Sequence, residues 1–433
     1  MRVRIVICGL LLAAWSGTNA AWAATSESED GSTKRFFSPS VGLSFDYRTN
    51  VYRSEQAPIA AGSLFFVPGM EVGAVTPQTD WSLDGSVGLR KFVVVGEPEA
   101  TSGVDRSQRL QNLDTFNEFN VGGELEVLRK KPVGMYLAER ATLRNNAADK
   151  DYAQAPFTSQ LRNRAMGGLR VSPGEALSLT AGAVHLYDTF RTPSSEGLAR
   201  FNNRETFGPT GDLKWSFFPR TYWVIQGSYE EVRWVDTVVE VTDAESVGTL
   251  QNELALPDSN HFKLRTGIQG QFTPKIYFDF LAGRGTAIYD AASAPVNKID
   301  SSLGSSIEGG DGLLIATQLR YQPSDKTRFT VSYRKDFLDA FFTNYVKFDV
   351  LQAGVSGEYG PVLPTLSYTS RVETYQGDIF REDILSRIRA GLGIKMARTT
   401  LMNLGFGWQQ RASSDVTVEY DDFDVSVGFN WVH

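Results

Sequence analysis

The residues with the clearest chemical potential are arginines and lysines at alternate positions of short runs. Arg140 and Arg144 lie in one run, and Arg162, Arg164 and Arg170 lie in the next. The full set is Arg90, Arg140, Arg144, Arg162, Arg164, Arg170, Lys263, Arg265, Arg320, Arg328, Arg334, Arg371, Arg387 and Arg389. Unpaired guanidinium groups are costly in a dry core. The spacing therefore predicts a wet, pore-lining wall that attracts anionic solutes or an anionic polymer.

A second interpretation assigns these cations to partners rather than to solutes. Carboxylates occur on the same alternate positions of other runs: Asp46, Asp84, Glu124, Glu126, Asp212, Asp279, Asp422 and Asp424. Ion pairs between the two sets would neutralise the lumen, and the sequence alone leaves both interpretations open.

Catalytic and metal-binding patterns are not found in the sequence. The three histidines are His185, His261 and His433, and none has a recognisable serine nucleophile or metal-ligand spacing beside it. His185 and His261 are expected to be surface residues. The one cysteine, Cys8, lies in the N-terminal signal. We therefore expect no enzyme activity, no metal and no cofactor.

The elements that must position these cations are strands. In 41–47, Val41, Leu43, Phe45 and Tyr47 alternate with small or polar residues, and 423–431 repeats the pattern. Segments of about ten residues with one apolar face are typical of transmembrane β-strands. The sequence thus predicts an all-β, antiparallel, up-and-down barrel embedded in the outer membrane.

The connections between strands predict the strand number. Tight turns, most of them with proline, occur around Pro77, Pro132, Pro173, Pro219, Pro274, Pro323, Pro361 to Pro364 and 397–399. Longer polar segments such as 96–115, 235–260 and 290–311 lie between them. Short periplasmic turns and longer extracellular loops are characteristic of these barrels. They give about 18 strands, with 16 as the alternative if the run 344–359 contains a bulge near Leu351.

Aromatic residues are expected at both lipid boundaries. On the periplasmic side they are Trp215, Phe217, Trp223, Phe272, Tyr321, Phe329 and Trp431. On the opposite side they are Tyr187, Tyr229, Tyr375 and Phe423. Such girdles flank the apolar band of outer-membrane barrels.

The N-terminus indicates export. Arg2 and Arg4 precede an apolar stretch that is too short to span a bilayer, and small residues follow at 21–23. We predict a signal peptide at 1–23, a polar segment at 24–37 and the barrel at 38–433. The net charge of −7 argues against nucleic-acid binding. A soluble propeller would show repeats, and none is visible.

The first hairpins resemble a known family. Asp46, Asn50, Val51, Tyr52, Arg53, Pro68 and Gly69 match the opening of the beta-barrel porin 2 group of outer-membrane proteins. That resemblance implies an outer-membrane barrel associated with exopolysaccharide secretion. The C-terminus departs from the usual terminal aromatic residue, because Val432 and His433 follow Trp431.

The expected function is export of a secreted polysaccharide, together with a periplasmic export partner and with outer-membrane lipid and lipopolysaccharide around the barrel. The alternatives are a general or anion-preferring diffusion porin, a structural or adhesive barrel, and an outer-membrane enzyme. Polymer export predicts a broadly polar lumen with inward aromatic residues. Simple diffusion predicts a loop folded inside as a constriction.

Overall fold

The computed structural model describes eleven segments of the chain. They are 33–50, 60–95, 118–128, 131–144, 159–174, 176–191, 201–238, 258–290, 312–340, 345–376 and 381–432. The predicted signal peptide, most of 24–37, most of the three long loops and His433 lie outside them. None of the helices in these segments is long and apolar enough to cross a membrane.

Eighteen strands make up the described chain. They are β1 (Lys34–Arg48), β2 (Ala61–Val75), β3 (Thr79–Val94), β4 (Glu118–Val127), β5 (Val133–Arg144), β6 (Ser159–Val171), β7 (Leu177–Arg191), β8 (Phe201–Phe218), β9 (Thr221–Val238), β10 (Ser259–Thr273), β11 (Ile276–Tyr289), β12 (Leu313–Ser324), β13 (Thr327–Asp339), β14 (Tyr345–Gly357), β15 (Val362–Gln376), β16 (Arg381–Lys395), β17 (Thr400–Ser413) and β18 (Tyr420–Val432). A short 3-10 helix, η4 (Val416–Val418), precedes β18.

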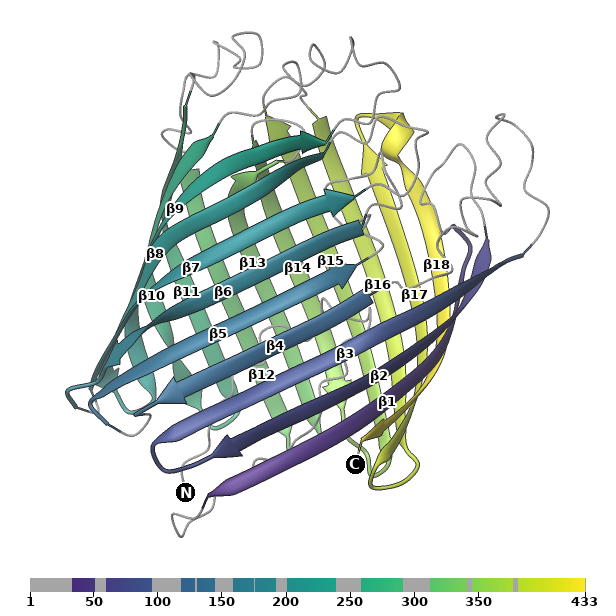
Figure 1. Ribbon diagram of the computed structural model, residues 1–433, viewed down its shortest axis with the longest axis horizontal. Coiled ribbons are helices and arrows are strands. Elements are labelled where there is room, and N and C mark those ends of the chain that lie inside the picture. Colours follow the sequence, from purple (N-terminus) through teal and green to yellow (C-terminus); the bar gives the residue numbers. More distant parts are fainter. Residues whose placement is uncertain are drawn as a thin grey trace.

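The sheet closes on itself, as predicted. Each strand pairs antiparallel with the next, and β18 pairs with β1 from Ser40↔Val432 to Arg48↔Asp424. Figure 1 shows the strands strongly tilted around a continuous wall. Closure satisfies the backbone hydrogen bonds of all the strands, which is the condition for a sheet to lie in lipid.

Side-chain facing follows the predicted alternation. Phe45, Leu89 and Leu169 point outward and are 51%, 45% and 48% exposed, whereas Asp46, Ser86 and Thr180 take the inward positions. Large apolar side chains are exposed in this way on every strand of the wall. A closed barrel with an apolar exterior spans a membrane, and the chain is an outer-membrane β-barrel.

The eight short turns all lie at one end of the barrel. They connect β2 to β3, β4 to β5 and so on to β16 and β17, and the start of β1 and the end of β18 lie at the same end (Figure 1). Three turn residues have positive φ: Leu128 (58°), Arg220 (67°) and Gly360 (65°). Such tight reversals need left-handed backbone, which glycine adopts at least cost.

Two details differ from the sequence interpretation. The suggested bulge near Leu351 is wrong, because β14 pairs without a register shift to both β13 and β15. The apparent change of parity arises because Val346 and Phe348, both apolar, face inward and are buried. In addition, the barrel begins at Lys34 and not at the predicted residue 38. Lys34 to Phe37 pair with β2 through their main chain, so the pairing does not depend on the type of side chain.

Most of the predicted girdle residues are exposed on the outer face, including Trp215 at 54% and Phe423 at 44%. Tyr375 was wrongly assigned to this group. Its side chain is completely buried inside the barrel, where it donates a hydrogen bond to Glu373 over 2.7 Å. Counting positions forward along β15 from the outward Leu366 and Tyr368 places Tyr375 on the lumen side.

Topology gives a first prediction. Single cysteines introduced at 96–115 or 235–260 should react with an impermeant maleimide in intact cells, because the sequence predicts these segments to be extracellular loops. Cysteines at Pro173 or Pro274 should react only after the outer membrane is permeabilised. Labelling of the proline turns in intact cells would show that they face the cell exterior, opposite to the predicted orientation.

Facing gives a second prediction. Leu213→Arg places a cation against lipid and should lower the free energy of unfolding by roughly 2–4 kcal/mol if the position lies near the midplane. Thr180→Leu, on the inward face of the neighbouring strand, is the control and should be tolerated. Unfolding in urea, followed by the heat-dependent shift in electrophoretic mobility, measures both. If Leu213→Arg is harmless and Thr180→Leu misfolds, the lipid-facing and lumen-facing positions have been assigned the wrong way round.

Candidate functional site

All fourteen predicted basic residues take inward positions, but most of them have carboxylate partners. Arg140 holds Asp84 through two hydrogen bonds of 3.0 and 2.8 Å. The other ion pairs in this set are Arg90–Glu118, Arg162–Asp188, Arg170–Glu126, Arg371–Glu373, and Lys263, Arg265 and Arg334 with Asp336. Within the described segments, the neutralisation interpretation therefore accounts for at least eight of the fourteen cations.

A smaller group of cations lines the lumen without an ion pair to a carboxylate of the described segments. Arg144, Arg164, Arg320 and Arg328 form no ion pair with any residue of the described segments. Arg164 lies directly opposite Arg140 in the pairing of β5 with β6. Arg320 lies over the ring of Tyr277, with 5.4 Å between its guanidinium carbon and the ring centroid. Positive charge thus remains on the wall after the pairs are formed.

The extracellular end of β13 does not stay in the wall. β12 begins at Leu313, so β13 beyond Lys335 and β11 beyond Arg284 have no β12 between them. The end of β13, still paired to β14, turns inward and contacts β10. We call 336–339 and 345–348 the inner hairpin. It lies within the lumen, because it contacts the inward Lys263 and Arg265, whereas Phe262 and Leu264 point outward.

Asp336 is the central anchor of the inner hairpin. Its carboxylate accepts hydrogen bonds from Lys263 (2.9 Å), Arg265 (2.5 Å) and Arg334 (2.7 Å). Asp336 is only 3% exposed, so these charges interact at low local dielectric. One buried carboxylate among three cations leaves an excess of positive charge at this point of the lumen.

Asp339 forms a second anchor. It accepts hydrogen bonds from Tyr289 (3.0 Å) and Ser259, and it bonds to His261 Nε2 over 2.8 Å. The expectation that His261 lies on the surface is wrong, since it is 3% exposed. Ser259 is also bonded to that same Nε2, at 3.2 Å. A catalytic triad needs the acid and the serine on different ring nitrogens, so this cluster is a structural anchor.

Apolar packing completes the inner hairpin. Phe337 is 1% exposed and its ring lies against Gly285 of β11, where a Cβ would come within 2.6 Å of it. Phe337 and Tyr345 form one cluster with Ala287, Tyr289 and Leu314. Gly285 is therefore required by close approach, because any larger side chain would occupy the position of the ring.

A contact from β8, two strands away from β10 in the wall, reaches the same hairpin. Arg204 of β8 donates to the main-chain oxygen of Asp339 over 3.4 Å and to the carboxylate of Asp188 over 3.0 Å. Asp188 is completely buried and also binds Arg162 of β6. Polar contacts therefore run along the inner wall from β6 through β7 to β8, and from Arg204 of β8 they reach the inner hairpin.

A further ionic cluster lines β15 to β17 beside the inner hairpin. Asp383 accepts hydrogen bonds from Arg381 (3.1 Å) and from Arg411. Arg411 also lies 3.8 Å from Glu373. The guanidinium carbon of Arg381 is 4.4 Å from the ring centroid of Tyr375. The sequence did not predict Arg204, Arg381 and Arg411 as lumen residues. They lie near strand ends, where the alternation of apolar and polar residues is too short to assign a face.

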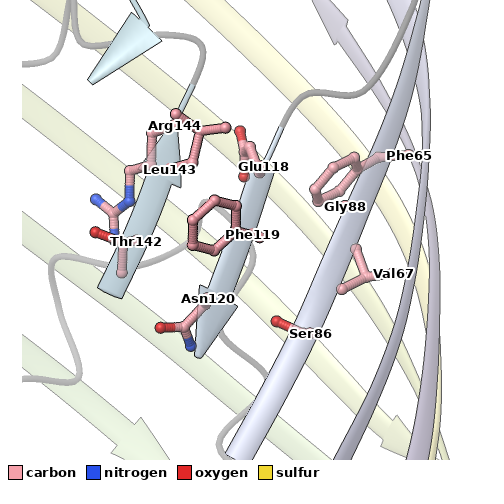
Figure 2. Close-up of a pocket in the computed structure, with 10 residues that line it drawn as sticks. All are labelled: Phe65, Val67, Ser86, Gly88, Glu118, Phe119, Asn120, Thr142, Leu143 and Arg144. Atoms are coloured by element: carbon pink, nitrogen blue, oxygen red, sulfur yellow. The ribbon is translucent and has the colours of Figure 1, made fainter. Parts of the chain in front are cut away.

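Below this level the wall contains a shallow recess on β2 to β5, drawn in Figure 2. Phe65 and Val67 provide an apolar side, and Glu118 and Arg144 come from the neighbouring strands β4 and β5. The cavity itself is about 30 Å³, the size of one water molecule. It can hold a water molecule but not an organic solute. No group of three or more potential metal ligands occurs in the described segments.

Comparisons with known proteins find the architecture and no closer relative. No family model matches the chain, and no curated protein matches it. Similar solved structures include OpdK of Pseudomonas aeruginosa with vanillate, which is 10% identical, with 92% of this chain and 99% of that chain covered and a TM-score of 0.46. OccK9 (OpdG) of the same organism is 10% identical, with coverages of 92% and 98% and a TM-score of 0.48. A BenF-like porin from Pseudomonas fluorescens Pf-5 is 10% identical, with coverages of 92% and 99% and a TM-score of 0.46. At such low identities and TM-scores, the likeness carries no inference about what crosses this barrel.

The packing of the inner hairpin gives a third prediction. Gly285→Leu should push Phe337 out of its place and so widen the passage, raising single-channel conductance in a planar bilayer. Gly85→Leu is the matched control, since its side chain would point to lipid from the outer face of β3, where no atom lies closer than 4.0 Å to the added Cβ. An unchanged conductance for a folded Gly285→Leu barrel would mean that the inner hairpin does not limit the pore.

Proposed function

We propose that this protein is a diffusion channel for small hydrophilic solutes, with a preference for anions. The observation that carries the proposal is the inner hairpin, a strand end folded into the lumen and held by Asp336, Asp339 and Phe337. A barrel of about 18 strands is wide enough for an aqueous channel. An inward constriction in such a barrel limits solute size without closing the pore.

The preference for anions follows from the charge beside the constriction. Arg334 is ion-paired to Asp336, yet its side chain is 58% exposed to the lumen. Its guanidinium carbon lies 5.5 Å from the ring centroid of Phe348, and that of Arg371 lies 5.4 Å from the same centroid. Cations in a narrow enclosure are weakly screened by salt and attract anions along the pore axis.

The lumen gives less support to export of a polysaccharide. A polymer path should offer aromatic faces to stack on sugar rings. The inward Tyr289, Phe337, Tyr345 and Tyr375 are instead buried in packing contacts. A chain of polymer would also have to pass the contact between Arg204 and Asp339. The first expectation from the sequence is therefore replaced by its diffusion alternative.

Ion selectivity gives a fourth prediction. The purified protein in a planar bilayer with a salt gradient should show a reversal potential of the sign that anion flow produces. Replacing Arg334 with Ser should reduce that potential, because it removes the exposed cation beside the constriction. Replacing Arg140, Arg144, Arg162 and Arg164 together should reduce it further. Lys91→Ser, on the outer face of β3, is the control and should leave it unchanged.

The bilayer measurement tests the anion preference and the channel activity separately. Conductance with cation preference would overturn the anion preference but leave the channel. Absence of conductance in a folded, heat-modifiable barrel would overturn the channel itself and favour a barrel that opens only with a partner.

A further inference from the structure

The outer face of β5 to β8 differs from the rest of the lipid-facing wall. At its centre Ala165, Gly167, Ala181, Ala183, Pro209 and Gly211 lie side by side on three neighbouring strands, and we call this group the platform. Gly167, Ala183 and Pro209 form one row across the strands, and Ala181 and Gly211 belong to the next. Elsewhere the wall presents exposed Leu83, Val121 and Val331 at comparable positions. Apart from Leu137 of β5, which lies beside Gly167, the platform presents only small side chains and one proline in the apolar band.

Polar side chains border the platform on the same outer face. Glu139 accepts a hydrogen bond of 3.1 Å from Asn163. On the other side of Ala165, His185 Nε2 lies 2.8 Å from Glu205. Both members of this second pair are well exposed, at 39% and 43% of their side-chain surface.

Glu139 lies at a depth where lipid supplies no hydrogen bonds. It is six residues beyond Val133, which at about 3.3 Å per residue and a tilt near 40° is roughly 15 Å above the periplasmic end of β5. The apolar band of such barrels is about 25 Å tall. Ionisable side chains in that band are costly, and they usually mark a functional contact.

The bonding of these polar groups is also incomplete. Glu139 has no cation within ion-pair distance among the described residues. Among the described residues its carboxylate accepts a hydrogen bond from Asn163 alone. A partner that brings donors to this face would stabilise the exposed Glu139 carboxylate in the apolar band.

The chemistry of the border favours protein over lipid as that partner. Lipopolysaccharide phosphates seek arginine and lysine, but this border contains two carboxylates, one carboxamide and one imidazole. Donors and acceptors occur together on one patch, as a self-complementary interface between like chains requires. Small residues allow two sheets to approach closely in a membrane, and polar side chains then join them.

We propose that the platform and its polar border form an interface between copies of this chain, so that the barrel is a homo-oligomer in the outer membrane. Every copy has the same orientation in the membrane, and the symmetry axis therefore lies along the membrane normal. The exposed Glu139 carboxylate then accepts hydrogen bonds from the second copy instead of facing acyl chains. This interface lies outside the lumen and is independent of the transported solute.

Cross-linking tests the interface directly. The chain has no cysteine after the signal peptide region, so Ala183→Cys places a single thiol on the platform. Val331→Cys on β13, which is 45% exposed to lipid, is the matched control. A membrane-permeant bifunctional thiol reagent applied to cells should give a species of twice the chain mass for Ala183→Cys and none for Val331→Cys. Equal cross-linking at both positions, or a product with a different added mass, would overturn the proposal.

A disruptive variant supplies the second measurement. Ala183→Trp adds bulk on the lipid side only, so the barrel should still fold and conduct while the oligomer dissociates. Light scattering of the detergent-solubilised protein should give a multiple of the chain mass for the native protein and a single chain mass for the variant. A native protein that is monomeric in both detergent and membrane cross-linking overturns the interface. Loss of conductance with an intact oligomer would instead count against the proposed channel.

Discussion

Every feature of this molecule depends on the requirement that backbone N–H and C=O groups be hydrogen-bonded within the membrane. An open sheet would leave the edges of β1 and β18 unpaired in lipid, at a cost of several kcal/mol for each group. Their pairing from Ser40↔Val432 to Arg48↔Asp424 removes both edges. Once the ring is closed, each side chain has one of two surroundings, lipid or lumen, and neighbouring positions alternate between them.

That alternation explains why so much of the fold could be predicted from the sequence. The apolar Phe45 and Leu89 indicate the lipid-facing positions, and the charged Asp46 and Arg90 beside them indicate the inward positions. The proline turns mark where the chain reverses. The prediction fails where a side chain has neither lipid nor water around it. Tyr375, Val346 and Phe348 are apolar and point inward, because the inner hairpin creates a small core inside the barrel. An alternation rule that assumes only lipid and water cannot identify side chains that are buried within protein.

The partners of the charged residues could not be predicted for a different reason. Arg140 and Asp84 lie two strands apart, and each occupies a plain inward position, so their pairing is compatible with the alternation. Lys263 and Asp336 are 73 residues apart and three strands apart in the wall. They meet only because β12 is too short to keep the end of β13 in the sheet. Nothing in the spacing of Lys263 or Asp336 encodes the length of β12.

Both proposals rest on the same kind of departure from alternation, seen on opposite faces of the wall. Apolar Val346 and Phe348 at inward positions of β14 imply a packed surface inside the barrel, and that surface belongs to the inner hairpin. Polar Glu139 on the lipid side implies a surface outside the barrel that can donate hydrogen bonds. The first surface belongs to this chain and, in the proposed channel, sets the size and charge of the passage. The second must come from another molecule, since β5 and its neighbours are already paired within the closed ring.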